Sequence, residues 1–181
     1  MSEFIMLIHN GFEEVEALTT VDLLRRSGNG VVICSMTGNK LLKGSHNINI
    51  IADCLFEELK TDSFDGIILP GGMPNSHTLR NDERVIETVR KFCEAGRLVC
   101  AICAAPCVLE RAGLLKGKRA TSYPGCIDAE SCIYSEEPAL RDGNIITSRG
   151  VGTAIPFALE IIKYVNGEGA AKRIAESIIY K

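Results

Sequence analysis

Three of the eight cysteines in this sequence lie within nine residues, in the stretch VCAICAAPC at positions 99–107. Cysteine thiolates act as nucleophiles, bind metal ions and form disulfides. The spacing of Cys100, Cys103 and Cys107 therefore leaves four alternatives. They are packing residues in the core, a metal site, a redox dithiol, or one nucleophile with two bystanders.

The surroundings of these cysteines favour some alternatives over others. A zinc site needs about four converging ligands, and no second pair stands at zinc spacing, so no metal is expected. Cys100 falls inside a predicted buried strand at 97–102 and faces away from Cys103. This disfavours a thioredoxin-like dithiol, whose first cysteine stands at an exposed helix start. Cys107 falls in the first turn of the next helix, where packing is its expected role.

Cys103 stands at the break between the strand LVCAI and the helix in AAPCVLERAG. A nucleophile elbow is a sharp strand-to-helix turn that lifts one side chain above the sheet and tolerates only small neighbours. Ala104 and Ala105 fit that requirement, and Pro106 suits a first helical turn. The helix N-terminus is expected to lower the pKa of the Cys103 thiol. Cys103 is therefore the candidate nucleophile, with a buried structural cysteine as the alternative.

The acidic run GFEEVE at 11–16 offers candidate partners for that thiol. The first turn of a helix explains Glu13 and Glu14, because acids there complement the helix dipole. Glu16 lies between Val15 and the apolar Leu18, so its side chain is expected to turn toward the sheet. A buried carboxyl tends to be protonated and can donate a hydrogen bond to a thiolate.

Short apolar runs alternate with helical patterns along the whole chain. The expected strands are 4–8, 28–36, 65–70, 97–102, 118–123 and 144–148, and the expected helices are 13–27, 82–95, 104–112, 153–166 and 168–179. This alternation predicts one α/β domain over residues 1–181, a doubly wound, flavodoxin-like sandwich with a mostly parallel sheet. Residues 41–53 are expected to form an exposed antiparallel excursion. Ligands bind beyond the carboxyl ends of parallel strands, which is where Cys103 is expected.

Composition narrows the classes of partner. The chain has 181 residues, 46% of them hydrophobic and 24% charged, which is enough for one sizeable core. The net charge is −3 without a long run of either sign, so neither nucleic acid nor a membrane is an expected partner. The segment MSEFIMLIHNG has too few apolar residues for a signal peptide, so a cytoplasmic location and reduced thiols are expected.

Four motifs occur in a fixed order over nearly the whole chain: GFEEVEALTTVDLLRRSG, FDGIILPGGMPN, AICAAP and ITSRGVGTAIPFALEII. Together they resemble the ThiJ/PfpI superfamily, in its parkinsonism-associated deglycase branch. The resemblance implies that Cys103 is a reactive elbow cysteine and that Glu16 forms a hydrogen bond with it. It also implies that Gly71, Gly72 and the amide of Ala104 form a cradle for an oxyanion or a carbonyl.

The same resemblance implies a homodimer in which Arg26 reaches toward the partner's site. Tyr123 stands where many members of the branch have a histidine. Its phenol is expected to bind the substrate by donating a hydrogen bond, but it is a poor base near neutral pH, so proton transfer falls to Glu16. His46 stands where some members have a second basic residue near the partner site. Ala104 stands where the protease branch has a histidine, so a Cys-His peptidase is not expected.

A reactive Cys103 thiolate is consistent with two functions of different classes. In the first, Cys103 adds to a small 2-oxoaldehyde such as methylglyoxal or glyoxal, or to its protein adduct, while Glu16 shuttles protons. This glyoxalase or deglycase chemistry requires no cofactor. In the second, the chain is an oxidative-stress sensor or chaperone in which Cys103 is oxidised to a sulfinate capped by Glu16, without turnover. Residue identities do not separate the two.

Overall fold

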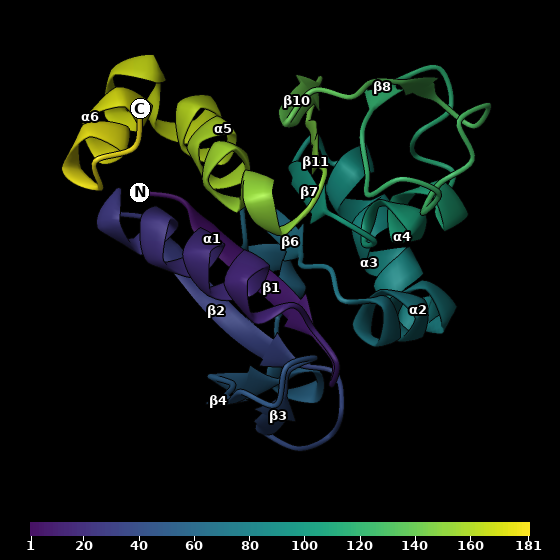
Figure 1. The fold of residues 1–181 in the computed structure, drawn as a ribbon. Helices are drawn as coiled ribbons and strands as arrows, with labels where there is room; N and C mark the ends of the chain where they lie inside the picture. The colour runs from purple at the N-terminus through teal and green to yellow at the C-terminus, as the bar shows by residue number, and fades with distance from the viewer.

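The computed structural model describes residues 1–181, which are arranged around a seven-stranded sheet of order β10-β11-β7-β6-β1-β2-β5 (Figure 1). Neighbouring strands pair in parallel except β10, which is antiparallel to β11. This confirms the expected mostly parallel sheet. The strands are β1 Glu3–Ile8, β2 Gly30–Ser35, β5 Cys54–Leu55, β6 Gly66–Leu69, β7 Leu98–Ile102, β10 Ala139–Asp142 and β11 Ile145–Ser148.

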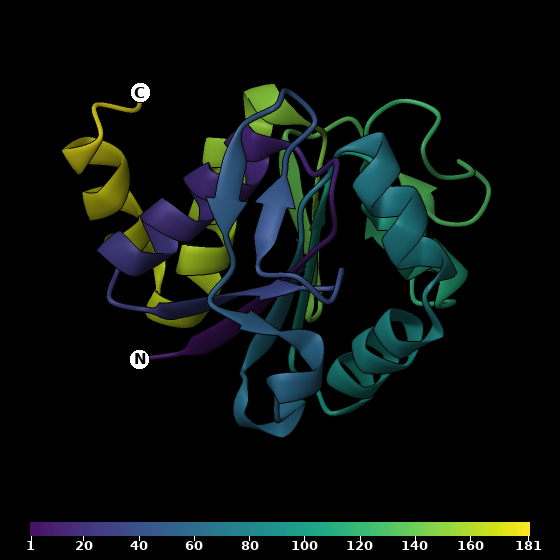
Figure 2. The same cartoon turned by 90° about the horizontal axis from the view of Figure 1, so that it is seen from below.

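Helices cover both faces of this sheet, with α1, α5 and α6 on one side and α2, α3 and α4 on the other (Figure 2). None of them is long and apolar enough to cross a membrane. The helices are α1 Glu14–Arg26, α2 Met73–Asn81, α3 Glu83–Glu94, α4 Pro106–Arg111, α5 Ala154–Asn166 and α6 Glu168–Ser177, with single 3₁₀ turns at Phe56–Glu58, Thr61–Ser63 and Val151–Thr153.

The central strand β1 shows why the chain forms three layers. Phe4, Met6 and Ile8 are buried in the core beneath α1 and α5, whereas Ile5 and Leu7 are buried in the core beneath α3 and α4. Successive residues of a strand point to opposite faces, so an unbroken apolar run requires cover on both. The two cores hold the carboxyl ends of the parallel strands at one common edge.

Three segments refine the expected arrangement. The excursion at 41–53 is confirmed as an antiparallel hairpin of β3 Leu41–Lys43 and β4 Asn49–Ile51. The expected strand at 118–123 is wrong as a member of the main sheet. Only β8 Arg119–Ala120 is extended, and it pairs with β9 Ile133–Tyr134 in a small separate sheet. Strand β10 takes the place beside β11 instead, because a two-residue turn joins these strands directly.

Candidate active site

Cys103 follows directly after β7 and has a φ of +64°, in the left-handed region that residues with a Cβ rarely adopt. Its backbone is held on both sides. The Cys103 N–H donates to Ser148 O over 3.0 Å, and Cys103 O accepts from the Tyr123 N–H over 2.8 Å. The side chain is half-buried. The chain therefore has the sharp turn after the strand that the sequence predicts, with the thiol at its apex.

Glu16 lies in the first turn of α1 and is completely buried, as expected. Its Oε2 accepts a hydrogen bond from the Gly71 N–H over 2.8 Å, while its Oε1 is buried without a hydrogen-bond partner. Burial raises the pKa of Glu16 to about 7, although its contact with the Cys103 side chain and the Gly71 hydrogen bond act in the opposite direction. Glu16 is therefore a carboxyl that changes protonation state near neutral pH.

The Cys103 thiol differs from the sequence expectation in its acidity. Burial, together with the neighbouring Glu16 carboxylate, raises the pKa of Cys103 to about 12. The expected lowering was wrong because burial of the thiol and the adjacent Glu16 carboxylate outweigh the hydrogen bond from the Ala104 backbone, which acts in the opposite direction. While Glu16 is ionised the thiol keeps its proton. Glu16 is then the group that can accept this proton when the sulfur reacts.

The loop after β6 approaches the pair closely because it consists of glycines. A Cβ on Gly71 would lie 2.5 Å from Glu16 Oε2 and 2.6 Å from the Cβ of Cys103. Gly72 has a φ of +87°, and a Cβ there would lie 2.2 Å from the carbonyl oxygen of Gly11. Both positions therefore require glycine, and the structure brings both beside Cys103.

The expected cradle of three amides is corrected to two. The Gly71 N–H is used by Glu16, so Gly71 positions the carboxyl instead of holding an oxyanion. The Gly72 N–H donates to no group of the chain, and the Ala104 N–H faces the Cys103 sulfur. Gly72 and Ala104 are thus the two backbone donors available beside the thiol.

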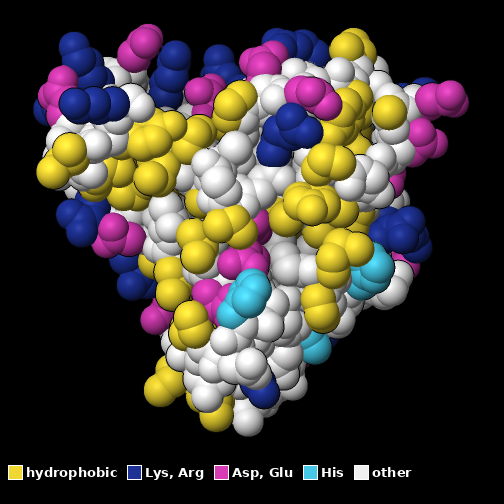
Figure 3. Space-filling view, viewed as in Figure 1, with side chains coloured by type: hydrophobic (Ala, Val, Ile, Leu, Met, Phe, Trp, Pro, Cys, Tyr) yellow, Lys and Arg dark blue, Asp and Glu magenta, His cyan; other side chains and the backbone are white.

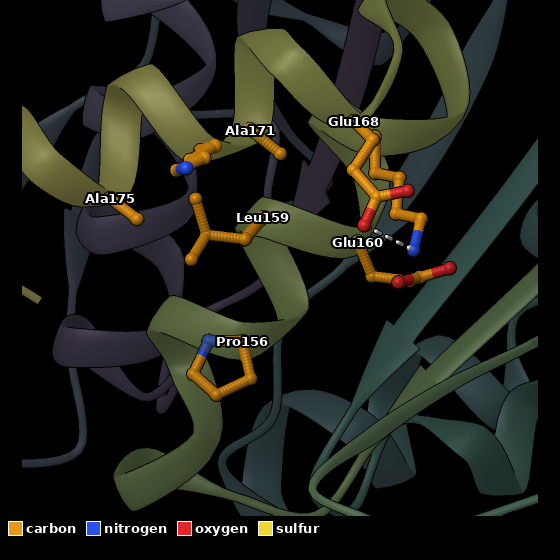
Figure 4. A pocket seen from close by; sticks show the side chains of 8 residues that line it. Pro156, Leu159, Glu160, Glu168, Ala171 and Ala175 are labelled. Atoms are coloured by element: carbon orange, nitrogen blue, oxygen red, sulfur yellow. Dashed lines mark ion pairs between the residues drawn. The ribbon is translucent and has the colours of Figure 1, made fainter. Parts of the chain in front are cut away.

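A hollow of about 260 Å³ opens above the thiol, a size that suits a small ligand. Tyr123 is brought to its rim by the hydrogen bond from its N–H to Cys103 O, and its side chain is exposed. The hollow is lined by Glu13, Gly72, Met73, Cys103, Ala104, Tyr123 and Cys126. A larger hollow of about 300 Å³ between α5 and α6 contains the ion pair of Lys163 and Glu168 but no cysteine or histidine (Figure 4).

Arg26 is not brought to this site within one chain. It follows Glu16 by ten residues on α1, which is about 15 Å along a helix. Its Nε lies 2.6 Å from Asp22 Oδ2 on the exposed surface. The expected role of Arg26 concerns the site of a partner subunit, and that role stays a prediction.

Glu14 has a different role from the helix-dipole role expected for it. Its Oε1 accepts a hydrogen bond from the His46 N–H over 2.6 Å, and its Oε2 lies 2.9 Å from His46 Nδ1. Burial alone would raise the pKa of Glu14, but the hydrogen bonds from the side chain and backbone of His46 and the backbone of Ile48 outweigh it and hold the pKa at about 2. Glu14 therefore fixes the tip of the β3–β4 hairpin to α1.

Glu13, Glu14 and His46 are also the residues whose ligand atoms lie close enough, within 4.8 Å of one another, to hold a metal ion. The same atoms already bond to one another. His46 Nδ1 lies 2.9 Å from Glu14 and 3.4 Å from Glu13. Direct bonds among these three residues account for their proximity.

Asn75 was missed by the sequence analysis. Its side chain is fully buried and links two loops of the site. Its Oδ1 accepts a hydrogen bond from the His9 N–H over 2.7 Å, while its Nδ2 donates to Pro70 O over 2.8 Å and Gly71 O over 3.1 Å. The available signal was an asparagine within PGGMPN, because a polar side chain beside a glycine loop often satisfies the backbone of that loop.

Known proteins resemble this chain both in sequence and in fold. The profile of the DJ-1/PfpI family matches residues 3–164. Protein dj-1beta of Drosophila melanogaster is 34% identical over 178 residues, which cover 97% of this chain and 95% of that protein. A protein of Pyrococcus abyssi that is named a deglycase is 32% identical over 88% of this chain and 96% of its own length. The structure of oxidized Toxoplasma gondii DJ-1 matches with a TM-score of 0.93 at 31% identity over 99% of each chain.

Proposed function

This chain belongs to the DJ-1/PfpI family, and from that premise we propose that it is a cysteine-dependent, cofactor-free enzyme of the glyoxalase or deglycase type. Its substrates would be small 2-oxoaldehydes, such as methylglyoxal and glyoxal, or their protein adducts. The observation that carries the proposal is the pair of Cys103, held at a φ of +64°, and the buried Glu16, beside a hollow of about 260 Å³. The relative from Pyrococcus abyssi that is named a deglycase supports it.

In the proposed first step the Cys103 sulfur attacks the aldehyde carbon. A sulfur–carbon bond forms while the carbonyl electron pair moves to oxygen, and the thiol proton passes to Glu16. The N–H groups of Gly72 and Ala104 stabilise the developing oxyanion. A pKa of about 7 allows Glu16 to accept this proton and to release it again near neutral pH. Glu16 then gives this proton to the oxyanion, so the step yields a hemithioacetal on Cys103 and leaves Glu16 ionised again.

In the second step Glu16 moves a proton between two carbons. It takes the proton from the former aldehyde carbon of the hemithioacetal and returns one to the neighbouring ketone carbon. The hydroxyl proton of the hemithioacetal passes to the former ketone oxygen, so the adduct becomes a thioester. Water then adds to the thioester carbon, the sulfur leaves, and Cys103 regains its proton. The sum for methylglyoxal is addition of one water to give lactate. For a protein adduct, the Cys103 sulfur displaces the amine or thiol of the protein from the adduct carbon, and this group leaves with the thiol proton, which gives the same hemithioacetal.

We further propose that the protein is a homodimer in which Arg26 lies near the partner's site. Apolar side chains lie on the face of the molecule that carries α1 and α5 (Figure 3). Val15 and Leu18 are 47% and 39% exposed on α1, and Ile48 is 52% exposed in the turn of the hairpin that Glu14 fixes to that helix. Exposed apolar residues on adjoining elements are typical of a self-association surface.

An oxidative-stress sensor or chaperone that uses the same cysteine is the second candidate. One observation favours it, because Glu16 Oε1 is buried without a hydrogen-bond partner and the Glu16 side chain contacts that of Cys103. A protonated Glu16 could donate a hydrogen bond from this oxygen to an oxidised sulfur. The similar Toxoplasma gondii structure is described as oxidized.

The test is steady-state turnover of methylglyoxal by the purified, reduced protein, followed through lactate formation. We expect turnover that is lost in Cys103→Ala and kept in Cys132→Ser, whose cysteine lies outside the hollow. A protein that forms no lactate, yet oxidises at Cys103 under mild peroxide, would favour the sensor instead.

A further inference from the structure

Cys126 lines the same hollow as Cys103, and the proposed reaction does not use it. It is half-buried, and it also lines an adjoining hollow of about 180 Å³ that reaches Cys107. The charge of a Cys126 thiolate would raise the pKa of Cys103, which reflects the proximity of the two sulfurs. Two thiols of different elements therefore face one small cavity.

Backbone hydrogen bonds tether Cys126 to the elbow. The Tyr123 N–H donates to Cys103 O over 2.8 Å, and the Cys126 N–H donates to Tyr123 O over 3.1 Å. Two successive hydrogen bonds thus connect the backbone of Cys126 to that of Cys103. Cys103 and Cys126 are far apart in the sequence, but these hydrogen bonds already hold their backbones near each other in the reduced protein.

The segment that carries Cys126 has room to move toward the elbow. Cys126 belongs to neither a helix nor a sheet strand, and Tyr123, Pro124 and Gly125 before it are exposed. A Cβ on Gly125 would meet nothing within 4 Å. The Cys126 sulfur makes only a weak contact, with the Met73 sulfur at 3.9 Å. No strong side-chain bond has to break for the thiol to approach Cys103.

The other nearby cysteines lack this freedom. Cys107 is fixed within α4, and its sulfur faces Ser76 O at 3.9 Å. Cys100 is completely buried in β7. Burial raises the pKa of all three thiols, so exposure and freedom of the backbone, and not acidity, distinguish Cys126. Cys126 is the more exposed of the candidates.

We propose that Cys126 is the resolving cysteine of Cys103, so that the two form a dithiol that reduces hydrogen peroxide. The Cys103 sulfur attacks the peroxide, the O–O bond breaks, and Cys103 becomes a sulfenic acid while one water leaves. The Cys126 sulfur then attacks the Cys103 sulfur, a disulfide forms, and a second water leaves. Two thiols are oxidised and one hydrogen peroxide is reduced to two waters. This inference rests on the proposed nucleophilicity of Cys103.

The disulfide would close the hollow above the elbow and stop carbonyl turnover until a thiol reductant restores both cysteines. It would also divert Cys103 from the sulfinic acid, which ordinary thiols do not reduce. Cys126 thereby determines whether oxidation of the site is reversible.

The experiment exposes the reduced full-length protein to a small molar excess of hydrogen peroxide. We expect an intact mass lower by about 2 Da, the loss of two titratable thiols, and a peptide linking Cys103 to Cys126. Dithiothreitol should restore all of the methylglyoxal turnover. In Cys126→Ser we expect a gain of about 32 Da at Cys103 and little recovery with dithiothreitol. Cys132→Ser is the matched control and should behave as wild type.

Three results would overturn the proposal: a gain of mass at Cys103 in the wild type without thiol loss elsewhere, a disulfide from Cys103 to Cys107, or no reaction with peroxide. Iodoacetamide labelling and methylglyoxal turnover on the same samples separate the two hypotheses. A protein that is labelled at Cys103 and turns over, yet forms no disulfide, refutes only the resolving role. A protein whose Cys103 is neither labelled nor active refutes the proposed function as well.

Discussion

At the scale of single residues, Glu16 and Cys103 act as one titrating unit. The pKa of Glu16 is raised to about 7 and that of Cys103 to about 12, each chiefly by burial. Between these values the pair carries one negative charge and one proton. The proton can lie on either partner, so the reactive form is the singly charged pair and not a free thiolate.

The pH dependence of turnover follows from that shared charge. Below pH 7 Glu16 is protonated and cannot accept the thiol proton, so kcat/KM for methylglyoxal should rise with pH through a midpoint at the Glu16 pKa of about 7. Glu16→Gln should remove this rise and lower kcat/KM by about 10²–10⁴-fold, the usual contribution of a general base. Rate profiles of both proteins from about pH 5 to about pH 9 would show it.

Glu94→Gln is the control for that experiment, because Glu94 is exposed at the end of α3. It should reproduce the wild-type profile. A wild-type profile that is flat across neutral pH, or a Glu16→Gln variant with normal turnover, would show that another group moves the proton.

The backbone of Cys103 gives a second prediction at this scale. A φ of +64° strains any residue with a Cβ, whereas glycine adopts it freely. Cys103→Gly should therefore be more stable than Cys103→Ala, by about 1 kcal/mol, since the two variants lack the same thiol. Urea unfolding of both variants measures the difference. Equal stabilities, or a more stable alanine variant, would contradict the assignment of strain to this position.

At the scale of elements, loops at the carboxyl ends of the strands hold the pair in place. Asn75 joins the loop after β6 to the end of β1, and the Glu13 N–H donates to Gly71 O over 3.0 Å. These bonds hold Gly71 where its N–H reaches Glu16. The geometry of the pair therefore depends on residues that touch neither the thiol nor a substrate.

Asn75→Ala tests this dependence. The change leaves the His9 N–H and the Pro70 carbonyl without the Asn75 side chain and removes one of the two donors to the Gly71 carbonyl. The free energy of unfolding should therefore fall by about 2 kcal/mol or more. It should also shift the midpoint of the pH–rate profile, because the Gly71 hydrogen bond helps to set the pKa of Glu16. Thr78→Ala, an exposed change on the same helix, should leave that midpoint unchanged. A destabilised Asn75→Ala protein with an unaltered midpoint would show a purely structural role.

The sequence predicts an element well where the residues of that element alone determine its structure. The runs FIMLI and LVCAI are apolar on both faces, and they identify β1 and β7 without further information. The helix α2 was missed, because MPNSHTLRN is mostly polar and buries few side chains. Segment 118–123 has residues typical of a strand, but β10 occupies the position next to β11 at the edge of the main sheet.

The features of the candidate site also differ in whether they depend on residues that are close together in the sequence. The elbow and the inward turn of Glu16 follow from short-range pattern, and both were predicted. The raised pKa of Cys103, the commitment of the Gly71 N–H and the hairpin contact of Glu14 depend on groups from distant parts of the chain. Spacing along one sequence carries no information about those distances, so these properties required the structure.

At the scale of the whole molecule, the proposed dimer can be tested through α1. Leu18→Glu places a charge on the exposed apolar face of this helix and should convert a dimer to a monomer. Ile133 is 60% exposed on β9, away from that face, so Ile133→Glu should remain dimeric. Sedimentation velocity at micromolar concentration measures all three proteins. A wild-type monomer, or a Leu18→Glu dimer, would refute the proposed surface.

The strand order has a consequence for how the chain acquires its reactivity. Glu16, Gly71 and Cys103 follow β1, β6 and β7, which are neighbours in the sheet although long segments of chain separate them. Such parallel pairings close large loops and form slowly compared with helices. The unusual titration of Cys103 can therefore arise only after the central strands have assembled. Before that point we expect the thiol to titrate as an ordinary cysteine, so the onset of its raised pKa would mark the assembly of β1, β6 and β7.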